Sequence, residues 1–281
     1  MPGTLYVVAT PIGNLEDVTL RALRILRDVS VIAAEDTRRT SRLLQHYSIS
    51  TPTTSLHAHN EEARTPGLIA RLRAGQSVAL VSDAGTPVVS DPGMRLVAAA
   101  HAAGIRVEPV PGPCAAVAAV SAAGIGGEGF VFAGFPPARA AARLEWLSRL
   151  AGERRPLVLY EAPHRIRATL HDMLDTFGDR TVALGRELTK AHEELVVRPI
   201  SSHIRQITDG RGEYTLVVSP ATDTELPNGA PTPEVIGREF GHLVENSLTG
   251  RRAAIKQLAL KYGLSARTVY SLVEKSRDSG K

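Results

Sequence analysis

The sequence has a single cysteine, Cys114, and few aromatic residues, which make up 4% of its 281 positions. One cysteine excludes an internal disulfide. No apolar run reaches the ~20 residues that a membrane-spanning helix needs. The first residues show no basic segment of the kind that begins a secretory signal peptide, so we expect none. Together these absences predict a cytoplasmic protein.

The signatures of several enzyme classes are also missing. The sequence contains no G-x-x-x-x-G-K-[ST] and no G-x-G-x-x-G after its first predicted strand, which excludes a P-loop and the dinucleotide fingerprint. It has no H-E-x-x-H and no C-x-x-C, and the pair His57 and His59 alone is a weak metal signal, so no metal site is expected. Without G-x-S-x-G, hydrolase chemistry has no support. The ligand should therefore be compact and lack a polyphosphate.

Positive charge is concentrated at the C-terminal end. From Thr249 onward, eight Lys and Arg residues face two acids, a balance of +6, whereas the whole chain carries +4 and the preceding part therefore −2. A basic module on a nearly neutral body indicates a polyanionic partner, most simply nucleic acid. The alternative is an ordinary solvated helix face. The candidate contacts are Arg251, Arg252, Lys256, Lys261 and Arg267.

Short apolar strands alternate with helices along most of the chain. Strands predicted at 5–9, 29–33, 78–81 and 106–110 are each followed by a polar loop and a helix. This alternation predicts a mostly parallel α/β domain over residues 1–129. A second α/β domain, with some antiparallel pairing, is predicted over 130–220. Residues 221–233 resemble a linker, and 234–281 a basic helical module ending in a helical hairpin.

Three loops follow predicted strands of the first domain: Thr10–Asn14, Ser82–Gly93 and Pro111–Ala115. We expect all three at one edge of the sheet, where open α/β sheets bind ligands. In the second loop, SDAGTPVVSDPG, glycines let the backbone approach a ligand, prolines stiffen the chain, and acids can hold hydroxyl or amino groups. One such loop could be an ordinary turn, but three of the same kind favour a binding site.

Five segments resemble the ribosomal RNA small subunit methyltransferase I family: ATPIGNLED at 9–17, AEDTR at 34–38, SDAGTPVVSDPG at 82–93, PGPCA at 111–115 and YEAPHR at 160–165. The resemblance runs from about residue 4 to 220. It implies a tetrapyrrole-methylase fold, in which two α/β domains hold S-adenosylmethionine in the cleft between them. It also implies 2′-O-methylation of a cytidine in 16S rRNA, as free RNA or in the 30S subunit, by a homodimer.

The resemblance also assigns residues to the cofactor. Asp83 takes the position of the acid that follows a strand, and small residues such as Cys114 and Ala115 let backbone groups reach the cofactor. The first loop is poorer in glycine than that of porphyrin-type relatives, which favours an RNA substrate. The full set of expected cofactor contacts is Pro11, Gly13, Asp83, Thr86, Cys114, Ala115, Tyr160, Arg186 and Tyr214.

Methyl transfer to a ribose hydroxyl needs alignment, exclusion of water and a base that draws off the proton. The candidates for base or substrate positioning are Glu35, Asp36, His59, Glu61 and Glu187. Arg38 and Arg39 could hold flanking phosphates. Several of these residues have a structural alternative: helix capping for Asp36, a solvated helix start for the two arginines, loop hydrogen bonding for His59 with His57, and a surface ion pair for Glu187.

Two other functions remain open at this point. The first is a tetrapyrrole methyltransferase of the same fold, which would have no RNA affinity. The second is a nucleic-acid-binding regulator with a degenerate α/β domain, which would bind duplex DNA and transfer no methyl group. The intact acidic and small-residue loops argue against degeneracy.

Overall fold

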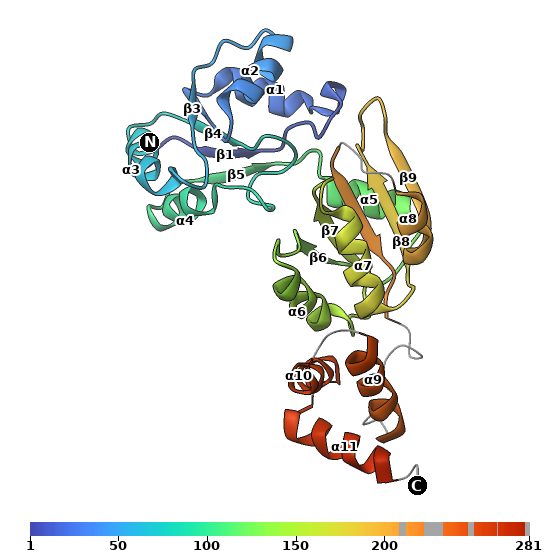
Figure 1. Cartoon of the computed structure of the whole chain (residues 1–281). Coiled ribbons are helices and arrows are strands. Elements are labelled where there is room, and N and C mark those ends of the chain that lie inside the picture. Colours follow the sequence, from blue (N-terminus) through green and yellow to red (C-terminus); the bar gives the residue numbers. More distant parts are fainter. Residues whose placement is uncertain (208–211, 222–232, 247–249, 263, 279–281) are drawn as a thin grey trace. The chain divides into compact units, whose positions relative to one another are not determined.

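The computed structural model describes residues 1–207, 212–221, 233–246, 250–262 and 264–278. Its contacts divide the chain into two compact units (Figure 1). Unit 1 comprises Met1–Gly124 and Gly185–Leu195, and unit 2 comprises Ile125–Leu184 and Val196–Lys281. The domain limits inferred from the sequence are drawn at other residues than this division, and they stay a prediction. Most of the predicted linker, 222–232, lies outside the described residues.

Unit 1 contains a five-stranded sheet with the order β3-β2-β4-β1-β5, and the paired strands are parallel. Its strands are β1 (Leu5–Val8), β2 (Val31–Ala34), β3 (Thr53–Ser55), β4 (Val78–Val81) and β5 (Val107–Val110). All residues of β2 and β4 are buried, as expected for apolar strands covered on both faces. The edge strand β3 was not predicted, because it is only three residues long and its sequence, TTS, is polar.

Helices cover both faces of this sheet. They are α1 (Leu20–Asp28) and α2 (Thr37–His46) on one face, and α3 (Glu61–Arg73) and α4 (Met94–Ala102) on the other. A short 3-10 turn, η1 (Leu15–Asp17), precedes α1, and α5 (Ala115–Ala123) follows the loop after β5. Successive residues of β4 point to opposite cores: Ala79 packs with Leu26 of α1, and Leu80 packs with Leu72 of α3. The predicted parallel α/β arrangement is therefore confirmed.

The second sheet has the order β6-β7-β10-β8-β9. Its strands are β6 (Val131–Gly134), β7 (Leu157–Glu161), β8 (Thr181–Arg186), β9 (Glu194–Pro199) and β10 (Tyr214–Val218). β6 runs parallel to β7, whereas β10 runs antiparallel to β7, which confirms the expected mixed pairing. One core joins the sheet to α6 (Ala140–Leu150), α7 (Ile166–Phe177) and α8 (Ile200–Gln206).

Unit 2 ends in three helices, α9 (Pro233–Asn246), α10 (Arg251–Tyr262) and α11 (Ala266–Asp278). Their common core includes Phe240, Leu258 and Val269. The hairpin expected from the sequence is α10 with α11, and α9 completes its core. Before α11, the Ser265 hydroxyl accepts a hydrogen bond from the Thr268 N–H (3.0 Å), as in a helix cap.

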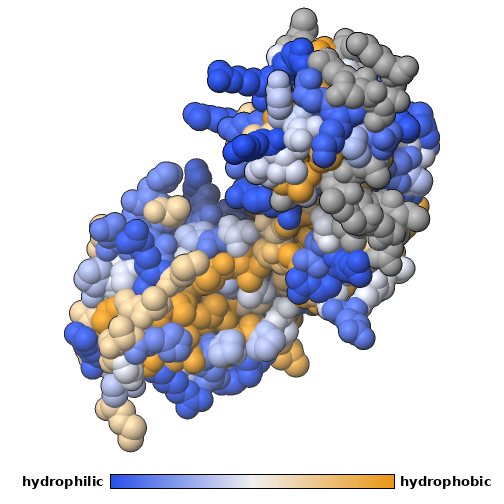
Figure 2. Space-filling model, turned by 90° about the horizontal axis from the view of Figure 1, so that it is seen from below, coloured by the Kyte–Doolittle hydropathy of each residue, from blue (hydrophilic) through white to orange (hydrophobic). Residues whose placement is uncertain are grey.

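The surface drawn in Figure 2 is mostly hydrophilic, with hydrophobic areas among the polar ones. Large hydrophobic side chains exposed in the structure include Phe130, Phe135 and Tyr270. In the part of the chain that the structure describes, no helix combines the length and the apolar character that crossing a membrane requires.

Candidate active site

The three predicted loops meet at the carboxyl end of the unit 1 sheet, because they leave the neighbouring strands β4, β1 and β5. Thr10 and Gly85 exchange backbone hydrogen bonds of 2.9 and 3.0 Å, which join the first loop to the second. The Thr86 hydroxyl donates to the Pro113 carbonyl (3.1 Å), which joins the second to the third. The expectation that these loops share one edge is confirmed.

Two glycines allow the loops to approach one another closely. Gly85 has φ +78°, and a Cβ placed on it would lie 3.3 Å from Ile12 Cγ2. A Cβ on Gly112 would lie 3.0 Å from the Cβ of Ala9. Larger residues would push these loops apart, so the local sequence keeps backbone groups accessible at the sheet edge.

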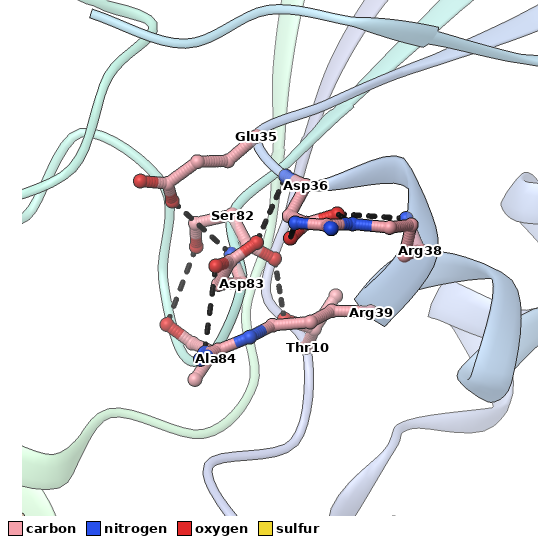
Figure 3. Close-up of polar contacts among 8 residues, drawn as sticks. All are labelled: Thr10, Glu35, Asp36, Arg38, Arg39, Ser82, Asp83 and Ala84. Carbon is pink, nitrogen blue, oxygen red and sulfur yellow. Dashed lines mark hydrogen bonds and ion pairs between the residues drawn. The ribbon is translucent and has the colours of Figure 1, made fainter.

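Acidic side chains from the loops that follow β2 and β4 converge at the same edge (Figure 3). The Asp36 N–H donates to Asp83 Oδ1 (2.9 Å), and the Asp83 N–H donates to Glu35 Oε2 (3.3 Å). Arg39 Nη1 lies 3.4 Å from Asp83 Oδ2. These reciprocal contacts fix Glu35 and Asp83 against each other, with one arginine beside them.

The carboxylates of this cluster are incompletely neutralised. Burial raises the pKa of Glu35, and the negative charges of Asp83 and Asp36 raise it further. A hydrogen bond from the Asp83 backbone and the positive charge of Arg39 lower it in part. Burial also raises the pKa of Asp91 to about 6, helped by repulsion from Glu35 and Asp83. A cationic ligand would relieve this repulsion, so the cluster suits a positively charged molecule. Among the residues described, no cluster of His, Cys, Asp and Glu is arranged to hold a metal ion.

Asp91 was not singled out from the sequence. The available signal was its place as the second acid of the SDAGTPVVSDPG loop. Around it the backbone is strained, because Val88 and Ser90 have φ of 73° and 68°. Positive φ is rare for a β-branched residue, and such strain is concentrated at ligand sites.

Asp36 caps a helix, which is the structural alternative given for it from the sequence. Its Oδ1 accepts from the Arg38 N–H (2.9 Å) at the start of α2, and its carboxylate is paired with the Arg38 guanidinium at 2.7 Å. The hydrogen bonds from Arg38 hold the pKa of Asp36 well below its usual range. Asp36 therefore caps α2 and is a weak proton acceptor.

Glu61 and His59 make contacts of their own. Glu61 is buried, and its Oε1 accepts from the backbone N–H groups of Arg95 (2.7 Å) and Leu96 (3.3 Å) at the start of α4. The His59 ring lies 6.1 Å from that of His57. A catalytic role for either residue stays a prediction.

The segment after β8 lies against the first loop. The Asn14 N–H donates to the Thr189 hydroxyl (3.0 Å), and a Cβ on Gly13 would lie only 2.4 Å from Lys190 Cγ. Glu187 has φ 51°, and its Oε1 is 2.8 Å from Lys190 Nζ. The structure thus brings together Gly13 and Glu187, two residues selected from separate parts of the sequence. Arg186, the last residue of β8, directly precedes Glu187.

The two tyrosines of unit 2 lie on opposite faces of its sheet. Tyr160 is paired with Thr215, and Tyr214 with Glu161, one position further along. Tyr214 is buried in the helix-covered core, whereas Tyr160 contacts Phe132 on the other face. A ligand on the Tyr160 face could therefore contact the backbone of Tyr214 but not its ring.

Comparisons with known proteins agree with this architecture. The family model described as Tetrapyrrole (Corrin/Porphyrin) Methylases matches residues 4–203. The structure of the methyltransferase CobJ is similar with a TM-score of 0.60 at 20% identity, over 78% of this chain and 95% of that one. Uroporphyrin-III-C-methyltransferase from Thermus thermophilus gives a TM-score of 0.54 at 24% identity, over 77% and 94%. The fold and site thus define a methyltransferase of the tetrapyrrole-methylase class.

Closer relatives narrow the assignment. The chain is 46% identical over 273 residues to ribosomal RNA small subunit methyltransferase I of Synechocystis sp., covering 96% of this chain and 97% of the relative. It is 51% identical over 222 residues to the protein of the same name from Pseudomonas aeruginosa, covering 77% and 79%. The chain belongs to the ribosomal RNA small subunit methyltransferase I family, as the loop motifs predicted. Methyltransferases of this family use S-adenosylmethionine.

Proposed function

We propose that the protein transfers a methyl group from S-adenosylmethionine to the 2′-oxygen of a cytidine ribose in 16S rRNA of the small ribosomal subunit. The observation that carries this proposal is the 46% identity, over nearly the whole chain, to a relative named ribosomal RNA small subunit methyltransferase I. The cluster of Glu35, Asp83 and Asp91 at the strand ends supports it with suitable chemistry.

These side chains fit the cofactor. S-adenosylmethionine carries a sulfonium and an ammonium group, and its ribose hydroxyls are hydrogen-bond donors. Carboxylates whose pKa is raised by burial and mutual repulsion gain from such a cation. The residues proposed to hold it are Pro11, Gly13, Asp83, Thr86, Cys114, Ala115 and Arg186, with Tyr160 and the backbone of Tyr214.

When bound, the cofactor supplies an electrophilic methyl carbon. The work of the protein is to orient the ribose hydroxyl, exclude water and accept its proton. Among the five candidate bases we favour Glu35, because it lies in the cluster and burial raises its pKa, which makes it a better proton acceptor. Asp36 is a poorer choice, because Arg38 stabilises its charged form. His59, Glu61 and Glu187 stay alternatives.

Two groups of arginines and lysines are proposed to contact the phosphates of the RNA backbone. Arg38 and Arg39 begin α2 next to the carboxylates, and their side chains are 88% and 60% exposed. On the C-terminal helices, Arg251 and Lys261 are paired with Glu274 and Glu239. Arg252, Lys256 and Arg267 are exposed there as well. From the family resemblance we further propose a homodimer that works in the cytoplasm.

The test is incubation with radiolabelled S-adenosylmethionine and 30S particles from a strain that lacks the enzyme. We expect label in 16S rRNA, at one cytidine, in a linkage that resists alkaline cleavage as a 2′-O-methyl group does. A Glu35→Gln variant should lose turnover at saturating cofactor, and Asp28→Asn, on the exposed face of α1, is the control. Label on a base, or on an added tetrapyrrole instead of RNA, would overturn the proposal. Binding of duplex DNA without methyl transfer would support the regulator instead.

A further inference from the structure

Three aromatic rings of unit 2 meet at the end of β6 and β7. The centroids of Phe132 and Tyr160 are 5.0 Å apart with an angle of 67° between the rings. Those of Phe135 and Tyr160 are 5.5 Å apart at 60°. Both are edge-on contacts of the kind that hold aromatic rings in place. Since aromatic residues make up only 4% of the chain, this gathering is not explained by composition.

A backbone irregularity brings the third ring to this position. In the β6–β7 pair, Phe132 is opposite Val158 and Gly134 is opposite Leu159, so one extra residue lies between them as a bulge. Gly134 has φ 70°, a conformation that glycine adopts at little cost. Bulges redirect side chains, and here Phe135 follows the bulge and contacts the ring of Tyr160.

Phe135 is held in place without being buried. Its side chain is 52% exposed, although water favours the burial of so large an apolar ring. The next residue, Pro136, accepts a hydrogen bond through its carbonyl from Arg165 Nη2, which fixes the loop to the turn before α7. An aromatic face that is fixed yet open to solvent suits a flat ligand.

The loops around Phe135 contain no acid of their own; Glu161, which precedes one of them, compensates the charge of Arg165, so the exposed charge is that of Arg139. Residues 135–139 and 162–165 read FPPAR and APHR and contain no acid. The carboxylate of Glu161 is fully enclosed, 3.2 Å from Arg165 Nε and 2.5 Å from the Thr169 hydroxyl. Arg139, the residue that precedes α6, is exposed. The surroundings therefore complement a negatively charged ligand.

We propose that Phe135, supported by Tyr160, is a stacking surface for an unpaired base of the RNA substrate, with Arg139 beside its phosphates. The inference rests on the proposed function, which supplies RNA as substrate. A base in a duplex hides both faces in its stack, whereas an unpaired base can stack on an aromatic side chain. A protein segment would also cover the ring, but the positive loops favour the nucleic acid.

The test compares Phe135→Leu, which keeps apolar volume but removes the aromatic face, with Phe130→Leu as matched control. Phe130 is also exposed, at 36%, and precedes the same strand. The probe is a fluorescein-labelled single-stranded RNA that spans the mapped methylation site, measured by anisotropy, alone and annealed to its complement. We expect Phe135→Leu to weaken binding of the single strand by about 5- to 100-fold. Phe130→Leu and Phe135→Trp should bind as the unsubstituted protein does.

Further measurements keep the inference separate from the function on which it rests. Cofactor affinity by calorimetry should be equal in all variants, and thermal melting identifies any variant that fails to fold. Equal affinity of Phe135→Leu and the unsubstituted protein for the single strand would overturn the stacking surface, even if 30S particles are methylated normally. Equal losses for single strand and duplex would overturn it too. Absence of methylation by the unsubstituted protein would instead contradict the proposed function.

Discussion

Replacing Asp91 by Asn should make the cofactor-free protein more stable at neutral pH. The carboxyl of Asp91 has its pKa raised from 3.8 to about 6, first by burial and then by the charges of Glu35 and Asp83. Its ionised form is therefore disfavoured in the native state. Asn removes the charge and retains an oxygen that can accept the Ser82 hydroxyl.

The magnitude and the sign follow from proton linkage. Because the native state binds this proton more tightly than the unfolded state, the stabilisation it gives is complete below about pH 4 and is lost as the pH rises through about 6. At 1.36 kcal/mol per pH unit, the difference between pKa values of about 6 and 3.8 has a ceiling of about 3 kcal/mol at pH 7. Solvent screening of this partly exposed group reduces it to about 1–2 kcal/mol.

The assay is urea unfolding of the cofactor-free protein at pH 4, 6 and 8. Asp91→Asn should match the unsubstituted protein at pH 4 and exceed its unfolding free energy by about 1–2 kcal/mol at pH 8. Asp28→Asn, which removes an exposed pair with Arg24 at 3.8 Å, is the control and should change little at any pH. A stability difference for Asp91→Asn that is absent at pH 8, or equal at all three pH values, would refute the reasoning.

Three further substitutions test other parts of the molecule. Asp83→Ala should weaken cofactor binding at least tenfold by calorimetry, since a hydrogen bond to a charged group is worth about 1.5–3 kcal/mol; unchanged affinity would remove Asp83 from the pocket. Glu61→Ala should lower the unfolding free energy by about 1–2 kcal/mol in urea titrations through loss of the α4 contact, and no change would contradict that role. Joint replacement of Arg252, Lys256 and Arg267 by Ala should reduce the slope of log affinity against log salt by about 2 for single-stranded RNA. A constant slope would leave these residues as a solvated surface.

The sheet of unit 1 and its binding edge were predictable from the sequence. Buried parallel strands are nearly continuous apolar runs, and VALV at 78–81 has that form. Because parallel strands end at a common edge, the loops that follow them had to meet. The strand β3 could not be found in this way, since its pairing depends on its neighbour β2 and not on its own composition.

The roles of individual acids were harder to predict, because they depend on partners distant in sequence. Glu61 is in the first turn of α3, yet its carboxylate accepts hydrogen bonds at the start of α4, 34 positions away. Asn60 directly precedes α3, but its side chain accepts a hydrogen bond from the His57 N–H and not from the helix. The pKa of Asp91 is raised first by burial and then by the charge of Glu35, which follows the separate strand β2. Spacing along the chain contains none of this information.

Unit 1 is built from two separate segments of the chain, which has a consequence for biosynthesis. Its last portion, Gly185–Leu195, is translated only after β6, β7 and most of β8 have been made. This portion supplies the Thr189 hydroxyl that accepts a hydrogen bond from the Asn14 N–H. A nascent chain released at Gly124 would lack this portion. Co-translational folding of the first unit therefore stays incomplete until the ribosome has passed Leu195, and an amino-terminal fragment expressed alone would leave Gly13 without its neighbour Lys190.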